Sequence, residues 1–148
     1  MAYYPYTKIQ FLLLILSLIN MMQITNAFVL SPKVILTFRS DLPKDSDLLK
    51  VHCQSKDDDI GVRTLNPGDQ FSFSFRMNIF GTTLFHCNLV WGSKHNHFEV
   101  FNQKRSYCYG RKLFKNIYCT WLMKDSGIYL ALGPNPSPSD FHFLYPWL

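Results

Sequence analysis

The sequence between Phe71 and Trp91 constrains the fold more than any other part of this chain. Its first half places Phe71, Phe73 and Phe75 at alternate positions, separated by serine. This period of two is typical of a strand with one buried face. Residues 81–83, Gly-Thr-Thr, interrupt the pattern, and a second alternating run ends at Trp91. We interpret the two runs as a hairpin-like pair of strands that forms the scaffold of the domain.

The first 27 residues have the pattern of a secretory signal peptide. Residues 11–19 are nearly all apolar, and residues 25–27 place small side chains where a signal peptidase reads them. We therefore expect cleavage after Ala27 and an extracellular, secreted protein. The alternative is a membrane anchor. Asn20 and Gln23 interrupt the apolar run well short of the ~20 residues that a span needs, which favours cleavage.

The remaining sequence predicts an all-β domain over residues 28–132. Short apolar runs separated by turn residues indicate about seven strands, and no segment after the signal peptide has a sustained helical period. We expect a small antiparallel β-sandwich whose core includes Trp91, Trp121 and the Phe71–Phe75 face. Residues 133–148 contain four prolines. This composition predicts an extended tail outside the sheets.

The cysteine pattern indicates disulfides. The four cysteines are Cys53, Cys87, Cys108 and Cys119. None forms a C-x-x-C pair, so we expect no zinc site. In a secreted chain an even number predicts two disulfides, with three possible connectivities. We favour Cys53–Cys119 and Cys87–Cys108, because inward cysteines on different strands would link early and late parts of a sandwich.

Charged residues in loops are the candidates for partner contact. The acidic turn at residues 57–59 lacks the D-x-D-x-D-G spacing of a calcium loop, so we expect no metal there. The loop around residues 93–97 and the basic segment 104–115 are the other candidates. The assigned contact residues are Asp57, Asp58, Asp59, Lys94, His95, Lys104, Arg105, Arg111 and Lys112. The net charge of +5 is modest and mixed along the chain, which favours an acidic cell-wall or membrane surface over nucleic acid.

Two other classes of function deserve comparison with binding. Five histidines suggest a secreted ribonuclease, since two histidines are able to share acid and base work. The sequence has no FTIHGLWP-like run and no nucleophile–base–orienter set, so we assign no catalytic or cofactor-binding residue. A cationic defence protein acting on microbial membranes is the second alternative. It would need a cationic amphipathic face, and no helix in the sequence offers one.

Two long runs carry a family resemblance. VHCQSKDDDIGVRTL, which begins at Val51, and NPGDQFSFSFRMNIFGTTLFHCNLVW, which begins at Asn66, resemble the plant self-incompatibility stigma-protein homologues, as do the later cysteines. The resemblance covers residues 34–132. It implies a small secreted β-sandwich with two disulfides that acts as an extracellular ligand. The founding members are pistil determinants that engage a receptor on pollen.

The resemblance also sets the expected partner. We expect a monomer that binds an unidentified plasma-membrane receptor, in self-incompatibility or in related cell signalling. We expect no catalysis, no cofactor and no nucleic acid. Because the resemblance stops at residue 132, it assigns no role to the tail.

Overall fold

The structure, a computed structural model, describes residues 7–30, 32–105, 107–108 and 115–148, with the backbone alone for residues 24–30. It contains two compact units, Met1–Ser31 and Pro32–Leu148. The first unit contains helix α1 (Lys8–Leu30), in which residues 11–16 are all apolar. Among the described residues, no helix combines the length and the hydropathy that crossing a membrane requires.

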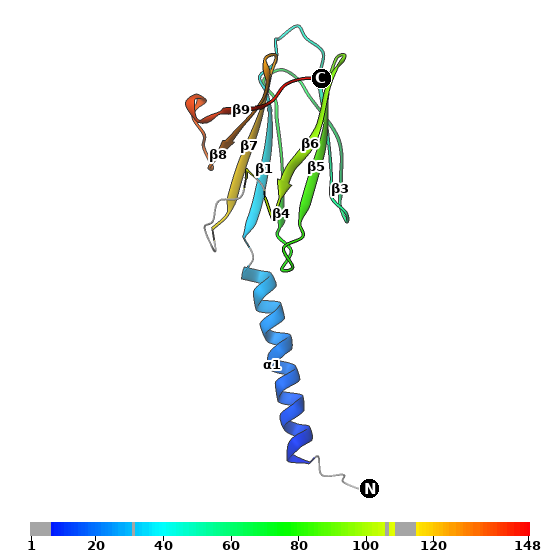
Figure 1. The fold of residues 1–148 in the computed structure, drawn as a ribbon, viewed down its shortest axis with the longest axis vertical. Coiled ribbons are helices and arrows are strands. Elements are labelled where there is room, and N and C mark those ends of the chain that lie inside the picture. Colours follow the sequence, from blue (N-terminus) through cyan, green and yellow to red (C-terminus); the bar gives the residue numbers. More distant parts are fainter. Residues whose placement is uncertain (1–6, 31, 106, 109–114) are drawn as a thin grey trace. The chain divides into compact units, whose positions relative to one another are not determined.

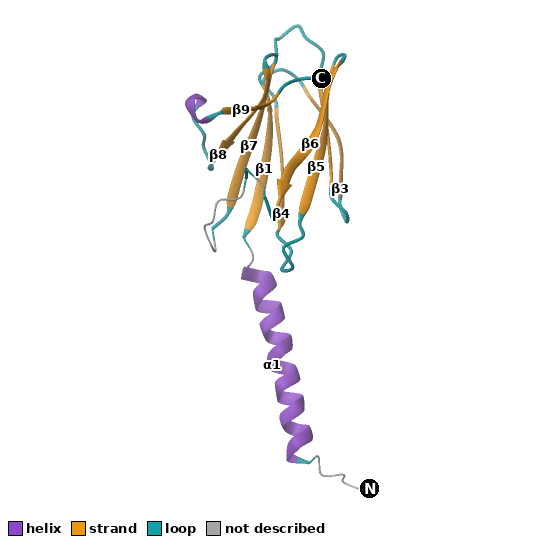
Figure 2. Cartoon of the chain, in the orientation of Figure 1, coloured by secondary structure: helices purple, strands orange, loops and turns teal. Residues whose placement is uncertain are grey.

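The second unit is built from two β-sheets (Figures 1 and 2), which confirms the predicted all-β fold. The first sheet has the strand order β4-β1-β7-β8-β9, and the second has the order β3-β2-β5-β6. The strands are β1 (Lys33–Ser40), β2 (Leu49–Gln54), β3 (Asp59–Leu65), β4 (Gln70–Arg76), β5 (Leu84–Trp91), β6 (Lys94–Asn102), β7 (Ile117–Lys124), β8 (Gly127–Leu132) and β9 (His142–Tyr145). The sequence predicted about seven strands, and the described residues form nine; β9 lies in the segment that was expected to be a tail.

The first sheet is mixed, whereas the second is antiparallel throughout. Strand β1 pairs antiparallel with β4 and parallel with β7. In the parallel pair Val34 lies opposite Ile117, and Phe38 lies opposite Trp121. Val34, Phe38 and Trp121 are almost completely buried. Strand β1 therefore lies at the centre of the core, because its alternate apolar residues point inward and its neighbours β4 and β7 also contribute apolar residues.

The predicted hairpin between the two halves of residues 71–91 is wrong. Strand β4 belongs to the first sheet and β5 to the second, so the loop between them crosses from one layer to the other. Phe75 and Phe85 meet across the core with ring centroids 4.4 Å apart. The ring centroid of Phe73 lies 5.4 Å from that of Phe85. The alternation of apolar residues identifies the buried face of each strand. The same alternation occurs when two strands are neighbours in one sheet and when they lie in facing sheets, so it does not distinguish these arrangements.

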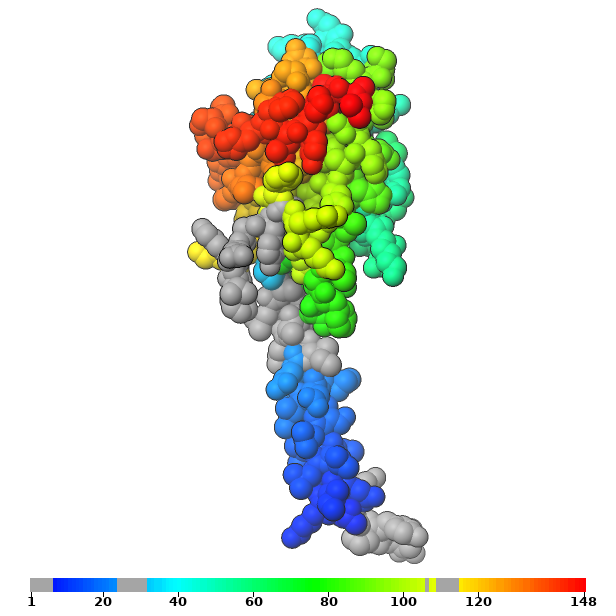
Figure 3. All heavy atoms as spheres, viewed as in Figure 1, coloured from blue at the N-terminus to red at the C-terminus, as the bar shows by residue number. Residues whose placement is uncertain are grey.

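The C-terminal residues are part of the sheet, so the predicted extended tail is also wrong. Strand β9 pairs with β8, and a short 3-10 helix, η1 (Pro138–Asp140), precedes it. The Trp147 indole N–H donates to the carbonyl of Lys124 at 2.7 Å. Leu148 exchanges two backbone hydrogen bonds with His95, which places the C-terminal segment against β6 (Figure 3). The prolines flank the edge strand β9 instead of interrupting it, which a sheet tolerates.

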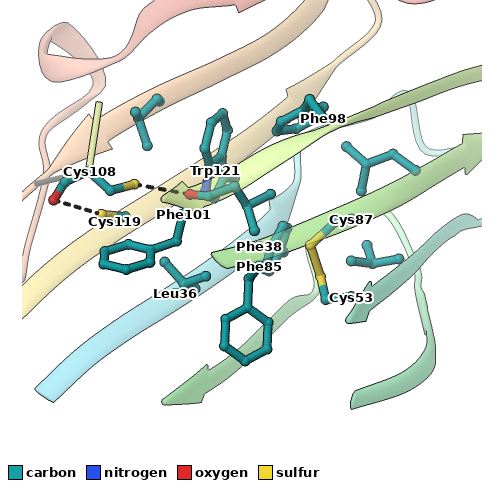
Figure 4. Close-up of a cluster of buried hydrophobic side chains, with 14 of the residues drawn as sticks. Leu36, Phe38, Cys53, Phe85, Cys87, Phe98, Phe101, Cys108, Cys119 and Trp121 are labelled. Atoms are coloured by element: carbon teal, nitrogen blue, oxygen red, sulfur yellow. Dashed lines mark hydrogen bonds between the residues drawn. A yellow bond between two sulfur atoms is a disulfide. The ribbon is translucent and has the colours of Figure 1, made fainter. Parts of the chain in front are cut away.

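The disulfide pairing differs from the predicted one. Cys53 and Cys87 lie directly opposite each other on β2 and β5 and are bonded, so the pairing Cys53–Cys119 with Cys87–Cys108 is wrong (Figure 4). Inward cysteines on adjacent strands meet more closely than inward cysteines on opposite layers. Cys108 and Cys119 lie together in the core, where the Cys119 Sγ is 3.5 Å from the Cys108 carbonyl oxygen. Burial and the hydrogen bond with Cys108 raise the pKa of the Cys119 thiol.

Candidate recognition surface

The loops of the domain gather at two opposite ends of the sandwich. One end carries the β2–β3 turn (residues 55–58), the β4–β5 loop (residues 77–83) and residues 103–105, which follow β6 (Figure 1). We call it the β4–β5 end. The opposite end carries the β5–β6 turn (residues 92–93) and the loop that precedes β2 (residues 41–48). The strand directions place the predicted contact residues on both ends rather than on one surface.

The acidic turn is held in shape by its neighbours. The Ser55 hydroxyl accepts the backbone N–H groups of Asp57 and Asp58 at 3.3 and 3.0 Å. Asp59 begins β3, and its Oδ1 accepts the Gly61 N–H and contacts the His52 Nε2, both at 2.8 Å. The Gly61 hydrogen bond, followed by His52, lowers the pKa of Asp59. Asp59 therefore maintains the turn, while Asp57 and Asp58 are exposed for contact with a partner.

A groove of about 690 Å³ runs between the acidic turn and the β4–β5 loop. Asp57 and Asp58 line one side of it, and Asn78 and Thr83 line the other. The loop is closed by a hydrogen bond of 2.7 Å from the Asn78 N–H to the Thr83 hydroxyl. One side of the groove is thus polar and is held in place by a hydrogen bond within the loop.

Two large apolar side chains project from this loop. Ile79 is 51% exposed and Phe80 is 79% exposed. The Phe80 N–H donates to the side-chain oxygen of Asn78 at 2.6 Å, which fixes the loop backbone. Sequence reasoning treated this loop only as a break between strands and missed both residues. The sequence feature that could have identified them is the presence of two bulky apolar residues between Asn78 and Gly81, in a turn that supplies no residue to the core.

The described start of the basic segment, residues 104–105, lies beside the same loop. The Gln103 side chain donates to the Asn78 carbonyl at 3.0 Å and accepts the Thr83 N–H at 3.3 Å. Lys104 and Arg105, the next residues, are exposed. Arg111 and Lys112, which the sequence also assigned to contact, lie outside the described residues. The β4–β5 end therefore combines acidic, apolar and basic side chains within adjoining loops.

Lys94 and His95 lie elsewhere. The sequence predicted that both residues lie in a loop. They instead begin strand β6, at the opposite end of the sandwich. The Lys94 ammonium lies 4.7 Å from the centroid of the Trp91 ring. The backbone of His95 is paired with Leu148. A groove of about 390 Å³ at this end is lined by the Asp45–Asp47 segment and Lys94, and it shares no lining residue with the β4–β5 end.

The histidines bond to amide and carboxylate groups. His52 contacts Asp59 and the Gln54 amide, and His97 contacts the side-chain oxygen of Asn88. Within the described part of the chain, no histidine ring is hydrogen-bonded to a hydroxyl or thiol. The same residues contain no group of three His, Cys, Asp or Glu side chains placed to hold a metal. These contacts suit a structural or surface role for the histidines better than nucleophile activation.

Comparison with known proteins defines the class. The family model described as "Plant self-incompatibility protein S1" matches residues 36–147. S-protein homolog 2 of Arabidopsis thaliana is 33% identical over 123 residues, which cover 83% of this chain and 73% of the relative. S-protein homolog 21 of the same plant is 38% identical over 106 residues, covering 71% and 78%. Self-incompatibility protein S1 of Papaver rhoeas is 38% identical over 80 residues, covering 53% and 55%.

A solved structure gives the same answer for the fold. It is described as a structure of self-incompatibility protein homologue (SPH) proteins, "a widespread family of small, highly stable, secreted proteins from plants". It superposes with a TM-score of 0.58 at 18% identity, over 79% of this chain and 96% of that one. The fold is therefore that of the SPH proteins, a small β-protein built from two sheets. The chain belongs to the plant S-protein homologue family, whose members are secreted, which confirms the expected extracellular location.

Proposed function

We propose that this protein is a non-catalytic extracellular ligand that binds a receptor protein on the plasma membrane through its β4–β5 end. The observation that carries the proposal is the exposure of Ile79 and Phe80 beside charged loops on a two-sheet scaffold. Exposed aromatic residues surrounded by polar groups are common at the centres of protein interfaces. The family name adds support, since it associates related proteins with self-incompatibility.

The mixed composition of this end favours a protein partner. A receptor surface offers apolar pockets and both signs of charge, which match Phe80, the acidic Asp57–Asp58 pair and the basic Lys104–Arg105 pair. The signal that follows binding belongs either to pollen–pistil recognition or to related communication between cells. In this proposal the ligand binds as a monomer and needs no cofactor.

We further propose that residues 1–27 are removed during secretion. The run of apolar residues in α1 ends before the small residues at positions 25–27. Intact mass and N-terminal sequencing of the protein recovered from the medium of expressing plant cells test this. A mature N-terminus at Phe28 is expected. Recovery of the uncleaved chain in the membrane fraction would instead support an anchor.

Receptor binding is tested with labelled protein and plasma-membrane vesicles. The double variant Ile79→Ser with Phe80→Ser should lose at least tenfold in affinity, because interface aromatics commonly contribute 2 kcal/mol or more, about thirtyfold. Leu48→Ser is the matched control, since Leu48 is 46% exposed at the opposite end of the sandwich. It should bind like the wild type.

Protease treatment of the vesicles distinguishes a protein receptor from lipid. Wild-type binding should disappear after the vesicle proteins are digested. Binding that survives digestion, or an equal loss in the Leu48→Ser control, would contradict a receptor site at the β4–β5 end. Circular dichroism of each variant confirms that the sheets are intact.

A further inference from the structure

Four of the five histidines lie on one face of the second sheet. They occupy outward positions on three neighbouring strands, β2, β5 and β6, whose alternate residues are buried in the core. We call this outward surface the histidine face. Its titratable and charged residues are Lys50, His52, Asp59, His86, His95, His97 and Glu99. His86 also shares the groove with Lys56, Asp57, Asp58 and Arg76, whose two positive and two negative charges cancel.

The strand register brings these histidines together. Asn88 on β5 lies opposite His52 on β2 and opposite His97 on β6. His86 lies opposite Glu99, and its ring centroid is 5.3 Å from that of His97. Neighbouring strands are about 4.8 Å apart and outward residues about 7 Å apart along a strand. The histidines therefore form a compact, flat group.

The hydrogen bonds of His97 and His52 are compatible with protonation of both rings. His97 donates through Nδ1 to the side-chain oxygen of Asn88, because an amide oxygen accepts only, and its Nε2 therefore remains the basic nitrogen. His52 contacts the carboxylate of Asp59, so a proton on that ring would form an ion pair. Histidine is the side chain that changes charge between pH 5 and 8 in its ordinary state.

Protonation reverses the sign of the face. With neutral histidines, Lys50 is outweighed by Asp59 and Glu99, which leaves one net negative charge. With all four histidines protonated, the face carries three net positive charges. Lys94 lies over Trp91 and Arg63 lies over Phe71, away from this face, whereas Lys56 and Arg76 line the groove beside His86 together with Asp57 and Asp58.

We propose that the histidine face is a proton-gated binding site for an acidic polysaccharide that carries carboxylate groups. A flat sheet face with spaced cations matches an extended chain with repeated negative charges. The described side chains of this face include no Phe, Tyr or Trp on which nucleobases would stack. Its exposed apolar residues are the aliphatic Val62, Leu84 and Val90, which are spread over two strands and form no continuous patch for insertion into lipid.

This site is centred on the outer face of the second sheet and meets the proposed receptor site at its edge. His86 borders the groove, and Asp59 holds the acidic turn. The two proposals are still tested separately, because one experiment measures binding to a polymer and the other measures binding to plasma-membrane vesicles. The consequence of proton-gated binding is retention of the secreted protein on an acidic polymer in mildly acidic surroundings and release when the pH rises.

The test measures binding of the secreted protein to sodium polygalacturonate at about pH 5 and about pH 7.5, at low salt. Carboxyl groups remain largely ionised at both pH values, so the change reports on the protein. The wild-type affinity should be at least tenfold higher at the lower pH. The variant His86→Asn with His97→Asn should lose most of that increase. His142→Asn, the matched control on β9, should retain it.

Three results would overturn the proposal. They are an affinity independent of pH, an equal effect of His142→Asn, and loss of the pH dependence when Lys104 and Arg105 are changed to alanine with the histidines intact. Methyl-esterified polymer should not bind, and anionic phosphatidylserine vesicles should bind no better at low pH. Binding to those vesicles in place of the polymer would identify a lipid surface instead. Thermal unfolding of each variant verifies the fold.

Discussion

Cys53 and Cys87 face each other across β2 and β5, with their Cα atoms 4.1 Å apart, and their sulfur atoms form a disulfide within one sheet. The bond joins strands that already share backbone hydrogen bonds. It therefore does not clamp the two layers together. Its stabilising effect comes from closing a loop across a sequence separation of 34 residues, which reduces the freedom of the unfolded chain.

Replacing both Cys53 and Cys87 by alanine should lower the free energy of unfolding by about 2–4 kcal/mol. Urea denaturation followed by tryptophan fluorescence measures this change. The wild-type protein treated with a reducing agent provides a comparison in which the side chains are kept. A loss below about 1 kcal/mol would mean that the unfolded chain is already restricted in this region.

Trp147→Ala should destabilise the domain by about 2 kcal/mol. The indole donates a hydrogen bond to the Lys124 carbonyl, and its ring lies 5.7 Å from that of Trp91. A half-buried tryptophan loses less than the 3–5 kcal/mol that a core tryptophan loses. Chemical denaturation measures the effect, with His142→Ala on β9 as the control. Equal stability of both variants would show that the C-terminal segment contributes little to the fold.

The sequence predicted the buried faces well because alternation reports burial directly. Trp121, Trp91 and the Phe71–Phe75 face were expected in the core; Trp121 is almost completely buried, and the others pack against the core as half-buried residues. Alternation contains no information about which strand is the neighbour. Phe75 and Phe85 were therefore assigned to one hairpin, although they meet across the core from opposite sheets.

The candidate site was predicted only in part, for a related reason. Asp57 and Lys104 were identified by their charge, and the fold places both in loops at the β4–β5 end. Lys94 was selected on the same ground, yet the strand direction places it at the opposite end. The pairing of β6 with β5 decides this position, and that pairing depends on contacts between residues distant in sequence.

Asp59 should contribute to stability at neutral pH and lose that contribution in acid. Its pKa is lowered in the folded protein by the Gly61 N–H and by His52, so the ionised form favours folding. The contribution is present above the unfolded pKa, near 4, and disappears as the pH falls through the lower folded value. The melting temperature of Asp59→Asn should therefore be lower than that of the wild type near pH 6. The difference should shrink toward pH 2.

Asp57→Asn is the control for this measurement, because the Asp57 carboxylate accepts no hydrogen bond from the described residues. Its melting temperature should follow the wild-type curve at every pH. A constant difference between Asp59→Asn and the wild type from pH 6 to pH 2 would contradict a role for the charge. It would point to lost packing in the turn instead.

Reversing the charge of Lys104 and Arg105 to glutamate should slow association with the receptor-bearing membranes more than it speeds dissociation. Exposed charges steer encounters, and they contribute less to the bound state. The rate constant should fall several-fold at low salt and approach the wild-type value at about 0.5 M salt. Stopped-flow mixing with labelled protein measures both rates. Lys44→Glu, in the loop at the opposite end, is the control and should leave the association rate unchanged.

Gly127→Ala should disrupt the packing of β9 against the start of β8, where Gly127 lies. Gly127 has a φ of 143°, and an added Cβ would lie 2.5 Å from a ring atom of Phe143 and 2.8 Å from the Tyr145 carbonyl oxygen. Backbone strain of this kind costs about 1–3 kcal/mol, and the clash with backbone oxygen adds to it. Gly61→Ala isolates the strain alone, because Gly61 has a φ of 73° and nothing lies within 4 Å of its added Cβ. Unfolding in urea should show a larger loss for Gly127→Ala. If the two variants are equally stable, β9 moves away at little cost and is only loosely held by the sheet.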